Sequence, residues 1–186
     1  IVAYAASKHI EVIPEIDMPG HFSAAMAAYP EFSCNPDGVH RVETWGGVFT
    51  DVLNVANPKA VRFVKDILDE LMAIFPSKNV HIGGDECPTT AWEHNAECQA
   101  MYKKLNLTSY RQLQTHFIAE ITDYLKSKGR KISVWNETVT EKGADLQLMK
   151  KTGATVYCWV PARKGAEIAN SLGLPSIYTV YGPYYI

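Results

Sequence analysis

The sequence lacks any apolar run long enough to cross a membrane, and its first residues lack the basic flank and cleavage site of a signal peptide. It also lacks an excess of charge of one sign, because 18 Lys and Arg residues stand against 20 Asp and Glu residues. This balance argues against the basic surface that attracts nucleic acids or anionic membranes. We therefore expect neither a nucleic acid nor a membrane among the partners of the protein.

The cysteines form no recognisable metal-binding or disulfide pattern. They lie far apart, without a C-x-x-C pair, at Cys34, Cys87, Cys98 and Cys158. Buried free thiols are therefore expected rather than structural zinc, and a Cys87–Cys98 disulfide has no support in the sequence. Two N-glycosylation sequons, at 106–108 and 136–138, matter only in a eukaryotic secretory protein, so the cellular compartment stays open.

The 186 residues are enough for one sizeable core, with 47% hydrophobic and 20% charged residues. No internal repeat or low-complexity linker divides them. The chain opens on a helical pattern and closes in or just past a predicted strand. We therefore expect residues 1–186 to be a piece of one domain in a longer protein.

Strand and helix patterns alternate along the chain. Predicted strands cover residues 10–16, 79–82, 131–135, 154–159 and 176–180. Predicted helices cover 1–8, 23–29, 58–75, 109–128, 145–151 and 164–172, and a short one begins within 88–92. Residues 30–57 form a long loop, which in a compact domain is usually functional. The alternation predicts an α/β fold with a parallel sheet and helical crossovers.

Residues suited to chemistry repeatedly follow the predicted strands. They are Asp17, His21, Asp85, Glu86, Trp135, Glu137 and Trp159. Active sites of (β/α)8 barrels lie at this C-terminal end of the strands, and a complete barrel has eight strands in about 250 residues. A doubly wound sheet is the alternative, but no glycine-rich phosphate fingerprint follows the first strand. We therefore predict a partial (β/α)8 TIM barrel of about five βα units.

The stretch from His81 to Glu86 is the centre of this prediction. A short apolar strand runs into two glycines, which let the backbone turn and approach a ligand closely. Neighbouring residues of a strand face opposite ways, so Asp85 and Glu86 share one site only if the chain turns there. Two such carboxylates, ringed by aromatic residues from later strands, indicate general-acid chemistry on a sugar. The alternative is a solvated loop with two charges.

Three segments resemble glycoside hydrolase family 20, the β-N-acetylhexosaminidases. They are Val12–His21 (VIPEIDMPGH), His81–Pro88 (HIGGDECP) and Trp135–Glu137 (WNE). The similarity covers essentially the whole chain, in the order expected for strands three to seven of the family's catalytic barrel. It implies hydrolysis of terminal non-reducing N-acetyl-D-hexosamine residues from β-linked glycans, with no cofactor and no metal. It also implies a secreted, periplasmic or lysosomal parent protein.

The resemblance further implies a retaining mechanism without an enzyme nucleophile, an exception among retaining glycosidases. The substrate's 2-acetamido carbonyl attacks the anomeric carbon and gives an oxazolinium intermediate. Glu86 is then the general acid and later the base that activates water. Asp85 orients the acetamido group and stabilises its developing positive charge.

The remaining substrate-binding residues follow from the same resemblance. Trp135 and Trp159 would wall the pocket around the acetamido methyl group, although strand-end aromatics are also common in cores. His21 would steer the acid, and Glu137 would order the tryptophan wall or face a neighbouring loop. Tyr185 is the best match to the tyrosine that hydrogen-bonds the acetamido carbonyl, with Tyr184 and Tyr181 as alternatives.

Several features depart from the family pattern or have a simpler explanation. The family's substrate-binding arginine precedes this chain, and its late Trp and Glu follow it, so we expect little or no turnover from the chain alone. Position 136 is Asn where the family usually has Asp. His81 is expected to be a satisfied core histidine, and Asp17 to cap the helix that follows it. Open edges of a partial barrel predict self-association.

Two other classes of function compete with the glycosidase. A metal-dependent hydrolase would use His21, His81, Asp85 and Glu86, but no H-x-H or H-E-x-x-H spacing is present. A non-catalytic sugar-binding barrel would need no proton donor, so the presence of both Asp85 and Glu86 argues against it. The sequence does not discriminate N-acetylglucosamine from N-acetylgalactosamine as substrate.

Overall fold

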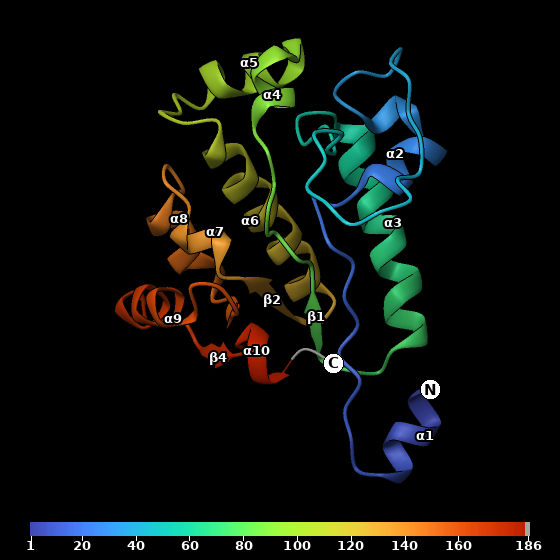
Figure 1. The fold of residues 1–186 in the computed structure, drawn as a ribbon, viewed down its shortest axis with the longest axis vertical. Helices are drawn as coiled ribbons and strands as arrows, with labels where there is room; N and C mark the ends of the chain where they lie inside the picture. Colours follow the sequence, from blue (N-terminus) through green and yellow to red (C-terminus); the bar gives the residue numbers. More distant parts are fainter. Residues whose placement is uncertain (185–186) are drawn as a thin grey trace.

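The structure, a computed structural model, describes residues 1–184. Its centre is a parallel sheet with the strand order β1-β2-β3-β4. The strands are β1 (Asn79–His81), β2 (Lys131–Trp135), β3 (Thr155–Cys158) and β4 (Ser176–Tyr178). Helix α6 (Arg111–Ser127) connects β1 to β2, α8 (Leu146–Thr152) connects β2 to β3, and α9 (Ala162–Ser171) connects β3 to β4. This order confirms the α/β prediction and has the form of a partial barrel (Figure 1).

The strand predicted at residues 10–16 is wrong as a regular strand. The segment does run parallel to β1, where the His81 N–H donates to Pro14 O (2.9 Å) and the Ile16 N–H donates to His81 O (3.1 Å). Only Glu15 makes an isolated parallel bridge, to His81. Pro14 has no N–H to donate, which breaks the ladder. The sheet of the described chain therefore has four strands instead of five.

The two long helices form where their apolar periodicity predicts. Helix α3 (Pro58–Ile74) begins with Pro58 in its first turn, after Asn57, whose side chain accepts the Lys59 N–H at 2.9 Å. It ends before Pro76, as expected. Helix α6 buries one face, at Leu113, Phe117, Ile118, Ile121 and Leu125. Burial of each large apolar side chain contributes about 1.5–3 kcal/mol, so these faces fix both helices.

The shorter helices include several that the sequence did not reveal. The structure contains α1 (Val2–Ser7), α2 (Ser23–Ala28), the 3-10 helix η1 (Pro30–Phe32), α4 (Thr90–His94), α5 (Ala96–Lys104), α7 (Glu137–Thr140) and α10 (Tyr181–Tyr184). Helices α5 and α7 were not predicted, because α5 buries only Cys98 and α7 is a single turn directly after β2. No helix of the described residues is both long and apolar enough to cross a membrane.

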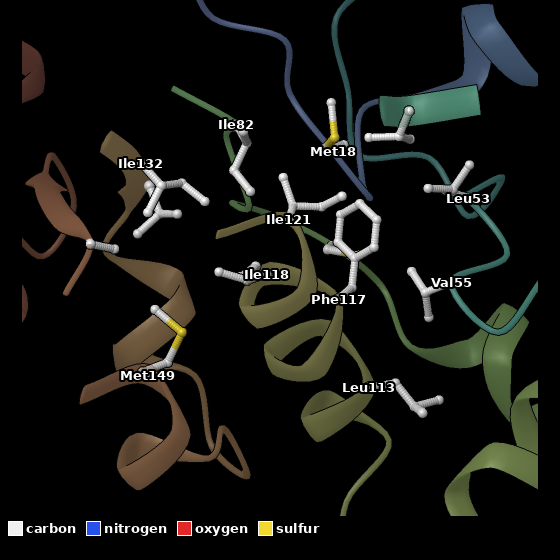
Figure 2. Packing of buried hydrophobic residues seen from close by; sticks show 14 of the residues in the cluster. Met18, Leu53, Val55, Ile82, Leu113, Phe117, Ile118, Ile121, Ile132 and Met149 are labelled. Carbon is white, nitrogen blue, oxygen red and sulfur yellow. The ribbon is translucent and has the colours of Figure 1, made fainter. Parts of the chain in front are cut away.

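The core joins the sheet, α6 and the long loop. Figure 2 shows Phe117 and Ile121 of α6 among Met18, Leu53 and Ile82, all of which are at most 2% exposed. Met18 follows the segment beside β1, and Leu53 lies within the loop predicted at 30–57, where it bridges to Ser33. The core therefore ties α6 to the segments at the C-terminal end of β1. All four cysteines are free thiols, and three of them are buried.

The described part of β4 pairs with β3 on one side, and no described strand covers its other edge. Ile177 on this strand is 42% exposed. We predict that the 186-residue chain associates through this edge and that Ile177→Lys reduces the association, because edge lysines block strand pairing. Sedimentation velocity over a range of concentrations measures the change. Ile74→Lys, at an exposed position ending α3, is the matched control. A monodisperse wild-type monomer that unfolds cooperatively would contradict the prediction.

Candidate active site

The candidate site lies at the C-terminal ends of the strands, as the barrel prediction requires. Asp17 and His21 follow the segment beside β1, and Asp85 and Glu86 follow β1 itself. Trp135 ends β2. Glu137 begins α7, and Trp159 directly follows β3. The structure thus brings the predicted residues to one end of the sheet.

A tight turn places the two acids after β1. Gly83 has φ +69°, Gly84 has φ +96° and Glu86 has φ +42°, so three of four consecutive residues take left-handed conformations. Such angles suit glycine and cost other residues about 1–2 kcal/mol. At Gly83 a side chain is excluded sterically as well, because a Cβ there would overlap the Asp17 carboxyl group. The glycine pair is therefore needed to turn Asp85 and Glu86 into one site.

All four backbone N–H and C=O groups of the glycine pair have partners, three of which come from other parts of the fold. The Gly83 N–H donates to His81 Nδ1 (3.1 Å), and Gly83 O accepts the Trp135 N–H (2.9 Å). The Gly84 N–H donates to Asp17 Oδ1 (2.9 Å), and Gly84 O accepts from Gln114 Nε2 on α6 (2.8 Å). These bonds satisfy the backbone groups of a buried turn and fix the direction in which the acids leave it.

His21 contacts both acids. Its Nε2 lies 3.1 Å from Glu86 Oε2 and 3.8 Å from Asp85 Oδ2. The Glu86 side chain is 39% exposed and that of Asp85 only 14% exposed. The acid that would protonate a leaving group therefore faces solvent, and the one that would orient a substrate group is more enclosed.

Asp17 is part of the site and is not a helix cap, so that expectation was wrong. Helix α2 begins at Ser23, with Phe22 at its N-cap position. Burial, together with the charge and hydrogen bond of Asp85, raises the pKa of Asp17 to about 9. Burial and the neighbouring Asp85 therefore favour the protonated form of Asp17. Asp85 Oδ1 is buried and has no hydrogen-bond partner among the described residues.

The two tryptophans form an aromatic wall whose indole N–H groups are both fixed by carboxylates. Trp135 Nε1 donates to Glu15 Oε1 and Trp159 Nε1 donates to Glu137 Oε1, at 2.7 and 2.8 Å. Their ring centroids lie 6.4 Å apart at 61°, and Tyr181 lies 6.5 Å beyond Trp159. Of the tyrosine candidates, Tyr185 lies outside the described residues.

Glu137 accepts the indole N–H of Trp159, one of the two tryptophans of the wall. The residue is only 9% exposed, and its Oε2 is buried with no hydrogen-bond partner in the described structure. Burial raises the pKa of Glu137 to about 7, against the hydrogen bond from Trp159, and the charges of Asp85 and Glu86 act in the same direction as burial. Glu137 therefore titrates near neutral pH within reach of the acid pair.

The hydrogen bonds of Asn136 explain why an amide fits at this position, where the family usually has Asp. Its Oδ1 accepts the Trp159 N–H (2.8 Å), while its Nδ2 donates to Val160 O (3.0 Å). An ionised carboxylate could not make both bonds, since it has no hydrogen to give. Asn136 thus joins the end of β2 to the end of β3, beneath the tryptophan wall.

His81 is buried, at 4% exposed, but it is not the fully satisfied core histidine that was expected. Its Nδ1 lies 3.1 Å from the Gly83 backbone nitrogen and 3.2 Å from Glu15 Oε1, while its Nε2 has no partner among the described residues. Burial alone would raise the pKa of Glu15, but His81 and Trp135 together hold it below its usual value. His81 and Glu15 therefore support the turn and Trp135 from behind.

The metal-ligand set considered from sequence is not assembled. Among the described residues, the three side chains that could hold an ion together are Asp17, His21 and Asp85, with ligand atoms within 4.8 Å of one another. His81 and Glu86 do not belong to that group. Because burial and the neighbouring Asp85 raise the pKa of Asp17, a cation at these three side chains would compete with a proton for the Asp17 carboxyl group.

A pocket of about 260 Å³ opens beside the exposed acid. It is lined by Val48, Glu86, Cys87, Pro88, Arg111 and Glu141. A larger pocket of about 340 Å³ lies between the long loop and α4 and contains none of the predicted site residues. We regard the smaller one as the relevant cavity, because a leaving group must lie next to its proton donor.

Comparison with known proteins assigns the chain to a family. The model of the family "Glycosyl hydrolase family 20, catalytic domain" matches residues 1–186. A beta-hexosaminidase of Porphyromonas gingivalis is 37% identical over 170 residues, covering 91% of this chain and 21% of that protein. One from Akkermansia muciniphila is 36% identical, covering 86% of this chain and 31% of its own. The chain therefore spans about a fifth to a third of the length of these relatives.

Solved structures give the same result. The chitobiase of Flavobacterium johnsoniae superposes with a TM-score of 0.84 at 32% identity, over 96% of this chain and 27% of that one. A Vibrio harveyi exo-β-N-acetylglucosaminidase in complex with N-acetylglucosamine superposes with a TM-score of 0.77 at 29% identity, over 95% and 27% of the two chains. The fold around the acid pair is thus shared with enzymes of this kind.

We predict that Gly83→Ala destabilises the protein more than Gly173→Ala does. Both positions have similar positive φ values, +69° and +73°, but a Cβ at Gly173 would meet nothing within 4 Å. Gly173→Ala should cost about 1 kcal/mol of unfolding free energy from strain alone, and Gly83→Ala about 2–4 kcal/mol from strain and overpacking. Urea unfolding measures both variants. Equal losses would mean that Asp17 moves aside at no cost.

We also predict that Glu137 makes stability depend on pH. The pKa of this carboxyl group is about 7 in the folded protein and 4.5 as a reference, so the folded state binds more protons between these values. The free energy of unfolding should therefore fall as the pH rises through that window. Glu137→Gln keeps the acceptor for Trp159 and removes the titration, so its advantage over wild type should grow from pH 5 to pH 8. A difference that does not change with pH in chemical unfolding would contradict this.

Proposed function

The chain belongs to glycosyl hydrolase family 20, and from that premise we propose that the protein containing it is a β-N-acetylhexosaminidase. Its substrates are glycans with β-linked terminal non-reducing N-acetyl-D-hexosamine. The observation that carries the proposal is the turn after β1, which brings Asp85 and Glu86 into one site with His21. The names of the relatives and the sugar bound to the Vibrio harveyi enzyme support the same substrate class.

The activity is proposed for the whole protein, since the chain covers 21% and 31% of the two curated relatives. We assign residues 1–186 to a single (β/α)8 catalytic domain, as the segment that supplies strands three to seven. The chain alone should turn over weakly, because the family's substrate-binding arginine has no counterpart in it. What the segment supplies is the acid, the orienting carboxylate and the aromatic wall.

We propose the retaining, substrate-assisted mechanism for this site. Glu86, held by His21 at 3.1 Å and open to the 260 Å³ pocket, protonates the glycosidic oxygen as the bond to the leaving group breaks. The substrate's acetamido carbonyl closes onto the anomeric carbon. Glu86, now ionised, then removes a proton from the water that opens the oxazolinium ring. An enzyme nucleophile on the opposite face is not needed.

Asp85 orients the acetamido group in this scheme. Its side chain is 14% exposed and lies beside Glu86 and His21, so its carboxyl group can accept the acetamido N–H in the more enclosed part of the site. The raised pKa of Asp17 favours its protonated form, which reduces the repulsion between this carboxyl group and Asp85. The Asp85 carboxylate would stabilise the positive charge that develops on the acetamido nitrogen. Trp135 and Trp159 would enclose the methyl group, and Tyr185 would hold the carbonyl.

Calorimetric binding of a thiazoline analogue of the intermediate tests the proposal on the full-length protein. We expect Asp85→Asn to weaken binding about 10–100-fold, the value of a hydrogen bond to a charged group. Glu86→Gln should retain binding but lower kcat about 10²–10⁴-fold on substrates with poor leaving groups. Asp37→Asn, an exposed change in the long loop, is the control.

The outcomes separate the competing functions. Tight binding that depends on Asp85, together with turnover that depends on Glu86, supports the hexosaminidase. Tight binding without any turnover by the full-length protein points instead to a sugar-binding barrel. Absence of binding by the wild-type protein would overturn the proposal and leave Asp85 and Glu86 as charges on a loop.

A further inference from the structure

A buried polar chain runs from α6 into the turn that carries the acids. Gln114 is 2% exposed, and its Nε2 donates to Gly84 O at 2.8 Å. Its Oε1 accepts from Arg111 Nη1, also at 2.8 Å. The two residues are three positions apart on the helix, which places their side chains on the same face.

We propose that Arg111 and Gln114 are positioning residues for the acid pair, acting through the Gly84 carbonyl group. The inference rests on the proposed function, because it assigns these residues to the performance of Asp85 and Glu86. Neither residue needs to touch the substrate's reacting atoms. Their role is to hold the peptide group from which Asp85 and Glu86 continue.

Arg111 determines which way the Gln114 amide points. A glutamine side chain both donates and accepts, so on its own it could offer either atom to Gly84. Arginine has only donors, and its guanidinium therefore fixes Oε1 toward itself and Nε2 toward the carbonyl of Gly84. The Arg111 N–H is in turn held by Ser109 Oγ at 3.2 Å, at the start of the helix.

Gly84 needs such a restraint because of its conformation. With φ at +96°, this residue lies in a region where glycine moves freely, and Glu86 two positions later has φ +42°. Asp17 holds the N–H of Gly84 and Gln114 holds its C=O, so the peptide groups on both sides are fixed. Rotation of the peptide group between Gly84 and Asp85 would change the direction of the chain at Asp85. It would therefore move the carboxyl group of Glu86 as well.

Arg111 also lines the pocket beside Glu86, together with Glu141. The residue that orients Gln114 therefore also lies on the side of Glu86 where the leaving group would bind. A loss of this link should therefore affect proton transfer to the leaving group more than binding of the sugar. This distinguishes a positioning role from a general contribution to stability.

The test uses the full-length protein and aryl N-acetylglucosaminides with leaving groups of graded pKa. We expect Gln114→Leu to lower kcat about 10–100-fold on poor leaving groups, several-fold on activated ones, and to change KM less than threefold. Gln114→Glu should give the same pattern without a change of shape, because its carboxylate pairs with Arg111 and cannot donate to Gly84. Arg111→Met should act in the same direction, and Arg111→Lys should restore part of the loss.

Thr122→Val is the matched control, since Thr122 is buried on the same helix and its hydroxyl donates to Ile118 O at 2.7 Å. It should leave the leaving-group dependence at the wild-type value. The double variant of Arg111→Met and Gln114→Leu should be no worse than Gln114→Leu alone, because Arg111 acts through Gln114.

Three results would overturn the inference. The first is an equal loss on all leaving groups, the second is a loss that Thr122→Val reproduces, and the third is additivity of the two substitutions. An active wild-type protein with unchanged Gln114 variants would remove this inference and leave the proposed function intact. An inactive wild-type protein would remove both.

Discussion

The peptide groups of Gly83 and Gly84 are the constraint on which the rest of the site depends. They leave β1 with positive φ values and are held by His81 at the end of that strand and by Trp135, Asp17 and Gln114 from other parts of the fold. Because each of these residues lies on an element fixed by the common core, the turn is determined by packing as well as by local sequence. Two adjacent acids can share one site only under this arrangement.

The closeness of several carboxyl groups affects which of them are protonated. Asp17, Asp85, Glu86 and Glu137 occupy a small volume, and full ionisation of all four would place like charges in a poorly solvated space. The fold raises the pKa of Asp17 to about 9 and that of Glu137 to about 7, so that fewer charges are present at neutral pH. Fewer like charges therefore surround Asp85 and Glu86, the two acids that the proposed mechanism uses.

Much of this arrangement could be predicted from the sequence, and the exceptions have physical causes. His21, Asp85 and Glu86 could be predicted as site residues because they follow predicted strands, and the C-terminal ends of parallel strands lie on the same side of the sheet. Asp17 was interpreted as a helix cap because Asp before a helix often is one, whereas its partner Gly84 lies 67 residues away. The sequence did not indicate a role for Gln114, because a polar residue on a helix normally faces solvent. Its contact with Gly84 forms only when α6 packs against the turn.

The secondary structure shows the same division. Helices α3 and α6 were predicted because their apolar periodicity extends over 17 residues each. Helix α7 has only four residues, too few for a periodic pattern. Residues 10–16 do not form a regular strand, although their β-branched composition favours one, because Pro14 has no N–H to donate to the ladder. Long periodic elements are thus encoded locally, and the short elements around the site are determined by tertiary contacts.

Asn136 has one further consequence for how the site responds to its surroundings. Its amide joins Trp159 and Val160 through a donor and an acceptor, and an amide does not titrate. An aspartate there would be another buried acid beside Glu137 and would change its bonding with acidity. The hydrogen bonds of Asn136 between the ends of β2 and β3 therefore do not depend on pH, although the carboxyl groups beside them titrate.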